Sequence, residues 1–231
     1  MKFLVIALLM TSTVNQANAN ECVILLHGMA RSEQSMSKMA KELSKQGYSV
    51  VNYGYPSTSM PIERIAEEHL PIALEQCGKA DQIHFVTHSL GGIVVRQYLS
   101  QNHIGNLGKV VMLGPPNSGS EVVDKLKNVP GFKLINGPAG LQLGTEANSV
   151  PNSLGPVDYP VGVIAGNRSI NLMLSSMLPE QDDGKVTVES TKLAGMKDHI
   201  VMPVTHTFMM RNKKVIKQVI AFLKAGKFNQ T

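Results

Sequence analysis

Ser89 has the clearest chemical potential of any residue in this chain, because it lies where a buried strand pattern gives way to a helix pattern. Residues 82–88 are rich in β-branched and aromatic side chains, and residues 93–99 have the apolar spacing of a packed helix. A serine at such a turn is lifted clear of the sheet, where its hydroxyl can attack a carbonyl carbon. The spacing predicts a nucleophile at Ser89. The alternative is a serine that only caps the helix.

The residues around such a serine must be small, because the strand and helix backbones pass close together there. Gly91 and Gly92 meet this demand on the helix side. Thr87 departs from the G-x-S-x-G pattern, which has glycine at that position. The motif by itself is therefore less specific than a complete one.

A serine hydroxyl needs a general base, and seven histidines are available. His206 follows a predicted strand over 199–204 and precedes the last helix, so a loop can hold its ring over the sheet edge. His88 adjoins the nucleophile and should point away from it, and His27 suits a loop-bracing hydrogen bond. We predict His206 as the base.

A carboxylate must orient that base. Asp182 and Asp183 lie in a turn marked by Gly184, within a segment (181–188) that we expect to be a turn and a short extended piece. Asp183, which adjoins the glycine, is preferred as the acid, and exposure of both at the surface is the alternative. Asp198 is near His206 in sequence but is expected at the other end of the last strand, about 20 Å away.

Strand and helix patterns alternate along the chain, which predicts an α/β fold with a mostly parallel central sheet and helices on both faces. Such a sheet places its site at the carboxyl ends of its strands. Pro71 is expected to bend or divide its helix. The predicted strands cover 22–26, 48–53, 83–86, 109–114, 161–166 and 199–204, and the predicted helices include 61–76, 93–99, 169–178 and a last one with residues 215–223 on its inner face.

The alternation stops between residues 115 and 160, where seven of the twelve prolines lie. We expect an irregular insertion with one short helix over 121–127, and a long insertion of this kind is a candidate lid. The methionine- and leucine-rich segment 169–178 is expected either to add an apolar wall to the site or to fill the core.

The first nineteen residues have the pattern of a secretory signal, with a basic start, a short apolar run and a small-x-small site ending at Ala19. Cleavage after about Ala19 predicts an exported protein, periplasmic or secreted, with a single domain over 20–231. Two cysteines in an exported chain predict a disulfide between Cys22 and Cys77, and two free thiols are the alternative. The net charge of +5 is scattered, which argues against nucleic acid and leaves loose contact with a membrane surface as an expectation.

The candidate residues occur in the order Ser89, Asp183, His206, which is the order of α/β-hydrolases. Together with His27-Gly28-Met29 and the segments 87–92 and 205–209, they resemble bacterial lipases and esterases of the α/β-hydrolase fold, including the triacylglycerol-lipase and palmitoyl-thioesterase branches. The resemblance covers nearly the whole mature chain.

The resemblance implies a carboxylic ester hydrolase that acts on small-molecule or lipid acyl esters through an acyl-enzyme. It also implies an oxyanion hole formed by the backbone N–H groups of Met29 and Leu90, with no cofactor, no metal and no obligate protein partner. Acyl transfer or thioester cleavage by the same three residues is the nearest alternative. A binding protein that keeps the fold without catalysis is the alternative from a different class.

Overall fold

The computed structural model describes residues 20–229, so the predicted signal segment lies outside the described residues. Its centre is a sheet of six strands that are all parallel, in the order β2-β1-β3-β4-β5-β6. The strands are β1 (Glu21–Leu26), β2 (Ser49–Tyr53), β3 (Gln82–His88), β4 (Leu107–Leu113), β5 (Val161–Gly166) and β6 (Asp198–Met202).

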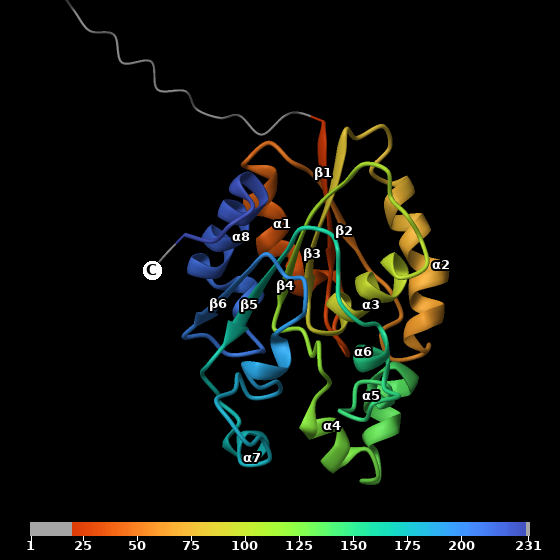
Figure 1. Cartoon of the computed structure of the whole chain (residues 1–231), viewed down its shortest axis with the longest axis vertical. Helices are drawn as coiled ribbons and strands as arrows, with labels where there is room; N and C mark the ends of the chain where they lie inside the picture. Colours follow the sequence, from red (N-terminus) through yellow and green to blue (C-terminus); the bar gives the residue numbers. More distant parts are fainter. Residues whose placement is uncertain (1–19, 230–231) are drawn as a thin grey trace, which may run out of the picture.

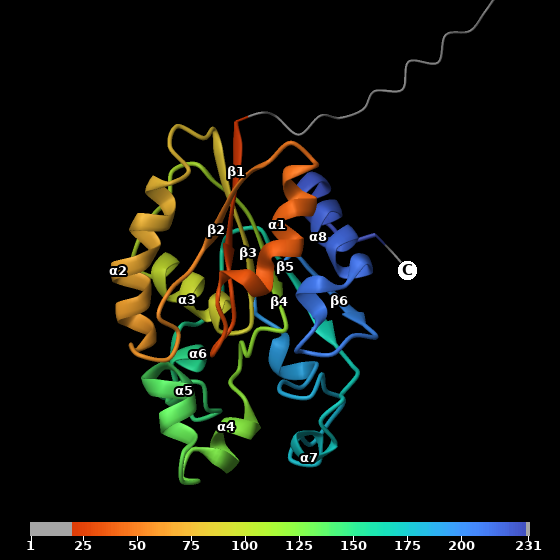
Figure 2. The ribbon, with the colours of Figure 1, turned by 180° about the vertical axis from the view of Figure 1, so that it is seen from behind.

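Helices cover both faces of this sheet (Figures 1 and 2). On one face lie α1 (Ser37–Ser44) and α8 (Lys213–Ala225), and on the other lie α2 (Ile62–Glu75) and α3 (Leu90–Leu99). The helices α4 (Glu121–Leu126), α5 (Phe132–Leu141), α6 (Val150–Ser153) and α7 (Leu172–Ser175) gather beyond the carboxyl ends of the strands. Three 3₁₀ helices complete the set: η1 (Glu33–Met36), η2 (Glu189–Thr191) and η3 (Met209–Arg211).

The strands divide their side chains between two hydrophobic clusters because successive residues point to opposite faces. In β1, Ile24 and Leu26 pack in the cluster that contains the inner faces of α2 and α3. Val23 and Leu25 pack in the cluster that contains those of α1 and α8. All four side chains are fully buried, so the alternation of β1 joins the two layers.

The strand order places a crevice beside the nucleophile turn. The chain leaves β1 for β2 on one side and then returns to β3 on the other side of β1. In doubly wound sheets, ligands bind outside the carboxyl ends of the strands at this change of direction. The loops after β1 and β3 therefore frame the candidate site.

The segment 115–160 is more regular than the sequence predicts. Besides the expected helix, now α4, it contains α5 and α6. Its prolines and glycines are compatible with these helices because of where they stand: Gly137 has φ 64° and divides α5, and Pro138 begins the turn that follows. Pro151 occupies the first turn of α6, where no N–H donor is needed.

Two other helix predictions need correction. The predicted helix over 169–178 is limited to the four residues of α7, and Leu172 and Met173 are exposed rather than packed against the core. Pro71 lies inside α2 without dividing it. The neighbours Leu70 and Ala73 are buried, and their packing holds the helix together where proline removes one hydrogen bond.

The expected extended piece over 181–188 is a loop with a single bridge between Asp182 and Thr187.

A disulfide joins Cys22 in β1 to Cys77 just after α2, with the Cα atoms 5.7 Å apart. This confirms the predicted pairing. In the chain-entropy model, a loop of this length contributes about 4 kcal/mol to stability. Within residues 20–229, no helix combines the length and the apolar character that crossing a membrane demands.

Candidate active site

Ser89 stands in a strained backbone conformation between β3 and α3. Its φ of 52° and ψ of −120° are rare for a residue with a side chain. Its N–H donates to the Leu113 carbonyl of the next strand at 2.9 Å, which helps to hold the turn in place. Backbone strain of this kind persists only where the surrounding structure imposes it, and it is common at functional sites.

The glycines after Ser89 allow α3 to approach the sheet closely. A Cβ atom on Gly91 would lie 2.9 Å from the carbonyl oxygens of Leu26 and His27, so no side chain fits there. A Cβ on Gly92 would lie 3.3 Å from Thr87 Oγ1. The threonine that departs from the usual pattern therefore fits because Gly92, opposite it, has no side chain.

Asp183 and His206 form a buried hydrogen-bonded pair. His206 Nδ1 donates to Asp183 Oδ2 at 2.8 Å, and the His206 backbone N–H donates to the Asp183 carbonyl at 2.9 Å. The other carboxylate oxygen accepts the backbone N–H groups of Lys185 (3.0 Å) and Val186 (2.9 Å). These contacts fix the orientation of the imidazole and leave its Nε2 available as a proton acceptor.

Two glycines at the ends of β4 and β5 make room for this pair, and the sequence analysis did not identify them. A Cβ on Gly114, whose φ is +53°, would lie 3.0 Å from Asp183 Oδ2 and 3.1 Å from His206 Nδ1. A Cβ on Gly166 would lie 2.8 Å from Asp183 Cβ. A glycine that ends a predicted strand next to a candidate site is the signal that could have found them.

His88 and His27 are buried next to the site, and each ring makes a hydrogen bond to a backbone carbonyl. His88 Nε2 donates to the His206 carbonyl at 3.0 Å. His27 Nδ1 donates to the Gly28 carbonyl at 2.8 Å, and its ring stacks on Tyr55 with centroids 4.2 Å apart. Burial lowers the pKa of both histidines, strongly for His88, so both are neutral braces at pH 7.

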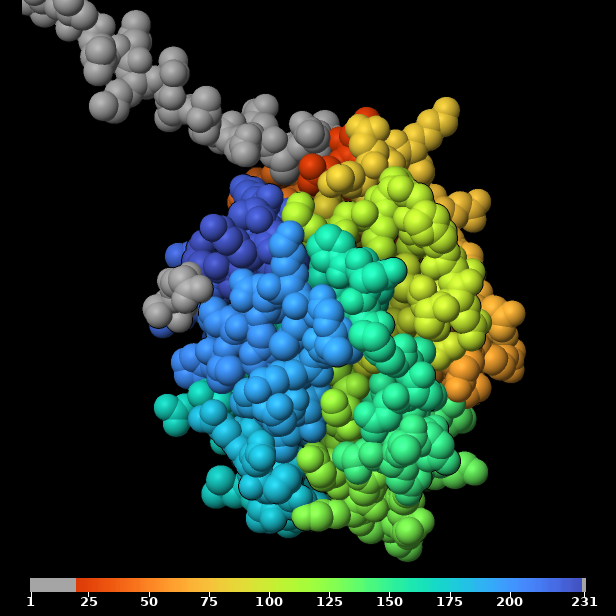
Figure 3. All heavy atoms as spheres, in the orientation of Figure 1, coloured from red at the N-terminus to blue at the C-terminus, as the bar shows by residue number. Residues whose placement is uncertain are grey.

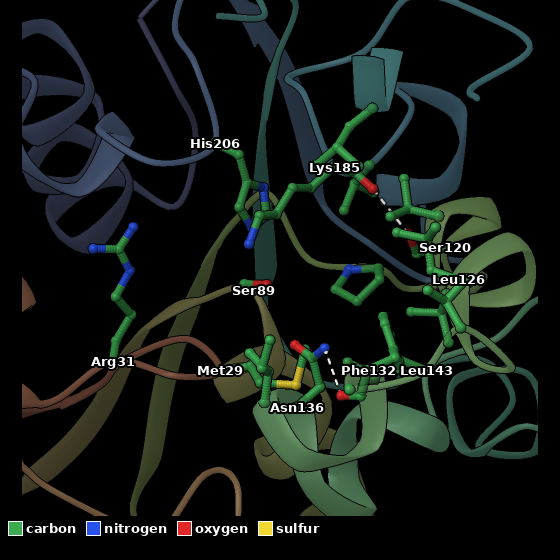
Figure 4. A pocket seen from close by; sticks show the side chains of 18 of the residues that line it. Met29, Arg31, Ser89, Ser120, Leu126, Phe132, Asn136, Leu143, Lys185 and His206 are labelled. Carbon is green, nitrogen blue, oxygen red and sulfur yellow. Dashed lines mark hydrogen bonds between the residues drawn. The ribbon is translucent and has the colours of Figure 1, made fainter. Parts of the chain in front are cut away.

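Ser89 and His206 line one cavity of about 360 Å³. Figure 4 shows the His206 ring pointing toward Ser89. Leu126 of α4 and Phe132 of α5, from the insertion, lie across Ser89 from Arg31. Apolar side chains dominate this wall: Val122, Val123 and Leu126 from α4, Phe132 and Ile135 from α5, and Leu143 and Leu174. The structure thus brings the predicted nucleophile and the predicted acid–base pair to one apolar cavity.

Of the two residues expected to form the oxyanion hole, Met29 lines the same cavity and Leu90 directly follows Ser89 in the chain. Met29 lines this cavity from the loop after β1, and the next residue, Ala30, has a positive φ of 54°. Leu90 is the first residue of α3, where helix N–H groups have no carbonyl partner within the helix. Both residues follow the carboxyl ends of neighbouring strands, Met29 after β1 and Leu90 after β3.

The other two acids considered from the sequence occupy different positions. Asp182 Oδ1 accepts the Ser175 hydroxyl and the Gly184 N–H, each at 2.6 Å, which ties α7 to the loop. Asp198 begins β6 and accepts the Phe228 N–H at 2.7 Å, at the end of the sheet away from the site. Neither contacts His206.

Two cations at the cavity mouth were not identified from the sequence. Arg31 and Lys185 both line the cavity together with Ser89. Each lies two residues after a predicted site residue, Arg31 after Met29 and Lys185 after Asp183, and this spacing could have indicated that they lie near the site. Loss of hydration near the cavity lowers the pKa of Lys185, and the Arg31 charge lowers it further.

No protein-family model and no curated protein matches the chain in sequence. Solved structures do match. A lipase of Bacillus licheniformis, BlEst2 in its mature form, superimposes with a TM-score of 0.68 at 18% identity, covering 91% of this chain and 94% of its own. The protein has the α/β-hydrolase fold.

Further α/β-hydrolase structures agree with this assignment. A metagenomic carboxyl esterase has a TM-score of 0.66 at 15% identity, covering 82% of this chain and 65% of its own. The esterase RhEst1 of a Rhodococcus species has a TM-score of 0.59 at 16% identity, covering 90% and 91%. These neighbours, all lipases or esterases by name, confirm the fold and the resemblance predicted from the sequence.

Proposed function

We propose that this protein is an exported serine hydrolase that cleaves carboxylic esters, with Ser89 as nucleophile, His206 as base and Asp183 as the orienting acid. One observation carries the proposal: His206, which is hydrogen-bonded to the buried Asp183, lines the same cavity as Ser89 in its strained turn. The lipase and esterase names of the structural neighbours agree with it. The signal-like segment 1–19 and the disulfide support export into an oxidising compartment.

The proposed reaction proceeds in two halves. His206 Nε2 takes the Ser89 proton as Oγ adds to the ester carbonyl, and the N–H groups of Met29 and Leu90 receive the oxyanion. The imidazolium returns the proton to the leaving alcohol as the C–O bond breaks, which leaves an acyl group on Ser89. A water molecule then adds with the same base, and the carboxylic acid is released as Ser89 regains its proton.

The apolar wall between α4 and α5 suits the acyl chain of the substrate. A cavity of about 360 Å³ lined by leucine, valine and phenylalanine takes a chain of medium length and does not favour a charged acyl group. Contact with lipid aggregates is supported by exposed apolar side chains in the segments 134–135 and 170–173, which belong to the green and cyan surface at the lower end of Figure 3. These are Leu134 and Ile135 on α5, and Ile170, Leu172 and Met173 at α7.

The test is a series of p-nitrophenyl esters of increasing chain length, dissolved and then emulsified, assayed with the wild type and Ser89→Ala. The variant should lose activity by about 10⁴-fold or more, because no other group can form the acyl-enzyme. Labelling of Ser89 by a fluorophosphonate probe provides the direct readout. Equal hydrolysis by both proteins would rule out the mechanism.

Acyl transfer by the same residues is the alternative within this chemistry, and competition of added alcohols or thiols with water for the acyl-enzyme separates the two. A binding protein that keeps the fold would be well folded yet would neither turn over esters nor react with the probe.

A further inference from the structure

The mouth of the cavity carries two cationic side chains, and the nearby Asp183 carboxylate balances only part of their charge. Among the residues lining the cavity, the charged side chains apart from histidine are Arg31 and Lys185, with no aspartate or glutamate among them. In the described part of the chain, neither side chain has a carboxylate within salt-bridge distance or a side-chain hydrogen bond.

The nearest acid is already engaged. Asp183 uses one carboxylate oxygen for His206 and the other for two backbone N–H groups, as described above. Burial and, to a smaller extent, the Arg31 charge lower the pKa of Lys185, whereas the Asp183 charge raises it; burial is also the main cause of the lowered pKa of His88, to which both cations add. Like charges held close together raise the energy of the empty site, and an anionic ligand would relieve this.

Arg31 and the apolar wall lie on different sides of the nucleophile, and Lys185 reaches the space beside His206 (Figure 4). In Figure 4, Leu126, Phe132 and Leu143 are on one side of Ser89, Arg31 is on the opposite side, and Lys185 extends beside His206. An ester bound with its acyl chain against the apolar side chains directs its alcohol portion toward the cations. The charge therefore meets the leaving alcohol and not the acyl chain.

Resting on the function proposed above, we infer that Arg31 and Lys185 select acyl esters whose leaving alcohol carries an anionic group, a phosphate or a carboxylate, close to the scissile bond. Arg31 suits such a group because its guanidinium presents a planar fork of donors. Lys185 adds a mobile point charge beside it. The products of cleavage are a fatty acid and an anionic alcohol.

The test compares two pairs of substrates that differ in this charge alone. The first pair is 2-nitrophenyl octanoate and 3-octanoyloxy-4-nitrobenzoate, which share a chromophore and an acyl chain. The second is octanoylglycerol and its 3-phosphate, so that the two arms separate a soluble carboxylate from a lipid-type phosphate. The quantity measured is the ratio of kcat/KM for the anionic substrate to that for the neutral one, in which the chemistry common to both cancels.

Arg31→Gln and Lys185→Gln should each lower this ratio by about tenfold, as expected for loss of one charge-assisted contact, and the double variant by about a hundredfold. Most of the change should appear in KM. Raising the salt concentration from 0.05 to 1 M should reduce the wild-type ratio because it screens exposed charges.

Three controls keep the result interpretable. Lys217→Gln on the exposed face of α8 makes the same change in net charge and should leave the ratio unchanged. Arg31→Lys and Lys185→Arg keep the charge and should keep most of the preference. Fluorophosphonate labelling of Ser89 shows that each variant retains a working site.

A ratio that is the same in the wild type and the double variant overturns this inference. If neutral esters are still cleaved in a Ser89-dependent way, the proposed function survives that outcome. Absence of Ser89-dependent cleavage of either substrate would instead remove the proposed function itself.

Discussion

At the scale of single residues, the site depends on hydrogen bonds that allow each side chain one role. Asp183 and Asp182 are adjacent in sequence and equal in chemistry, yet Asp183 is 2% exposed and faces His206, whereas Asp182 holds the loop to α7. Both oxygens of Asp183 accept hydrogen bonds, so the carboxylate cannot rotate away from the ring. A neutral amide there would keep its oxygen with the two backbone N–H groups and turn its NH₂ donor toward Nδ1, which favours the wrong tautomer of the ring.

Asp183→Asn should therefore lower kcat for ester hydrolysis by about 10³- to 10⁴-fold with little change in KM. The matched control is Asp182→Asn, which should retain activity within about tenfold because that side chain does not touch His206. Steady-state kinetics on a dissolved ester provide the measurement. Equal losses in the two variants would mean that Asp183 is not the orienting acid.

At the scale of elements, the site at the carboxyl ends of the strands depends on glycines that let the acid–base pair pack closely against the strand backbone. Gly114 directly follows β4 and Gly166 ends β5, and the space that their missing side chains leave is filled by the Asp183–His206 pair. Arg96 of α3 holds the insertion in place, because its guanidinium donates to the carbonyls of Asn117 (3.0 Å) and Gly155 (2.9 Å). The apolar wall of the cavity is therefore tied to α3, the helix that follows the nucleophile.

Gly114→Ala should push the acid–base pair away from its position, since the new methyl group would meet both side chains at about 3 Å. A shift of about 1 Å in the position of a catalytic group lowers kcat by about 10²-fold. The positive φ of the site adds about 1 kcal/mol of destabilisation.

The control for this prediction is Gly105→Ala, where a Cβ meets nothing within 4 Å. Activity assays and thermal unfolding of both variants provide the readout, and unaltered kcat in Gly114→Ala would contradict the expected crowding.

At the scale of the whole molecule, buried histidines link stability to pH. His27, His84 and His88 are at most 2% exposed, and burial is the largest cause of the lowered pKa of each. The unfolded chain has histidine pKa values near 6.5, so it binds more protons than the folded protein once the pH falls below that value. Stability must then fall as the pH falls.

The free energy of unfolding should decrease below about pH 6.5, by up to about 1.4 kcal/mol per pH unit for each histidine that stays neutral. Urea midpoints at pH 7.5, 6.5 and 5.5 measure this. His84→Gln should reduce the dependence because it removes one of the three groups, whereas His103→Gln, at an exposed position, should not. A midpoint that rises on acidification would contradict the linkage.

The local patterns of the sequence determined the order of strands and helices, the disulfide and the choice of Ser89, His206 and Asp183 as candidates. Strand alternation, helix spacing and turn residues act over a few neighbours, so they can be read without knowing the fold. In the insertion, α4 was predicted, but α5 was missed because Gly137 and Pro138 indicate a helix break until their exact places in the helix turns are known.

Only the tertiary structure decided what lies beside what. It brought Gly114 and Gly166 against the acid–base pair, and it placed Arg31 and Lys185, far apart in sequence, at one cavity mouth. Such proximity arises from the order of strands in the sheet and from backbone approach within a few ångströms. Those distances depend on packing across the whole domain, which no short stretch of sequence records.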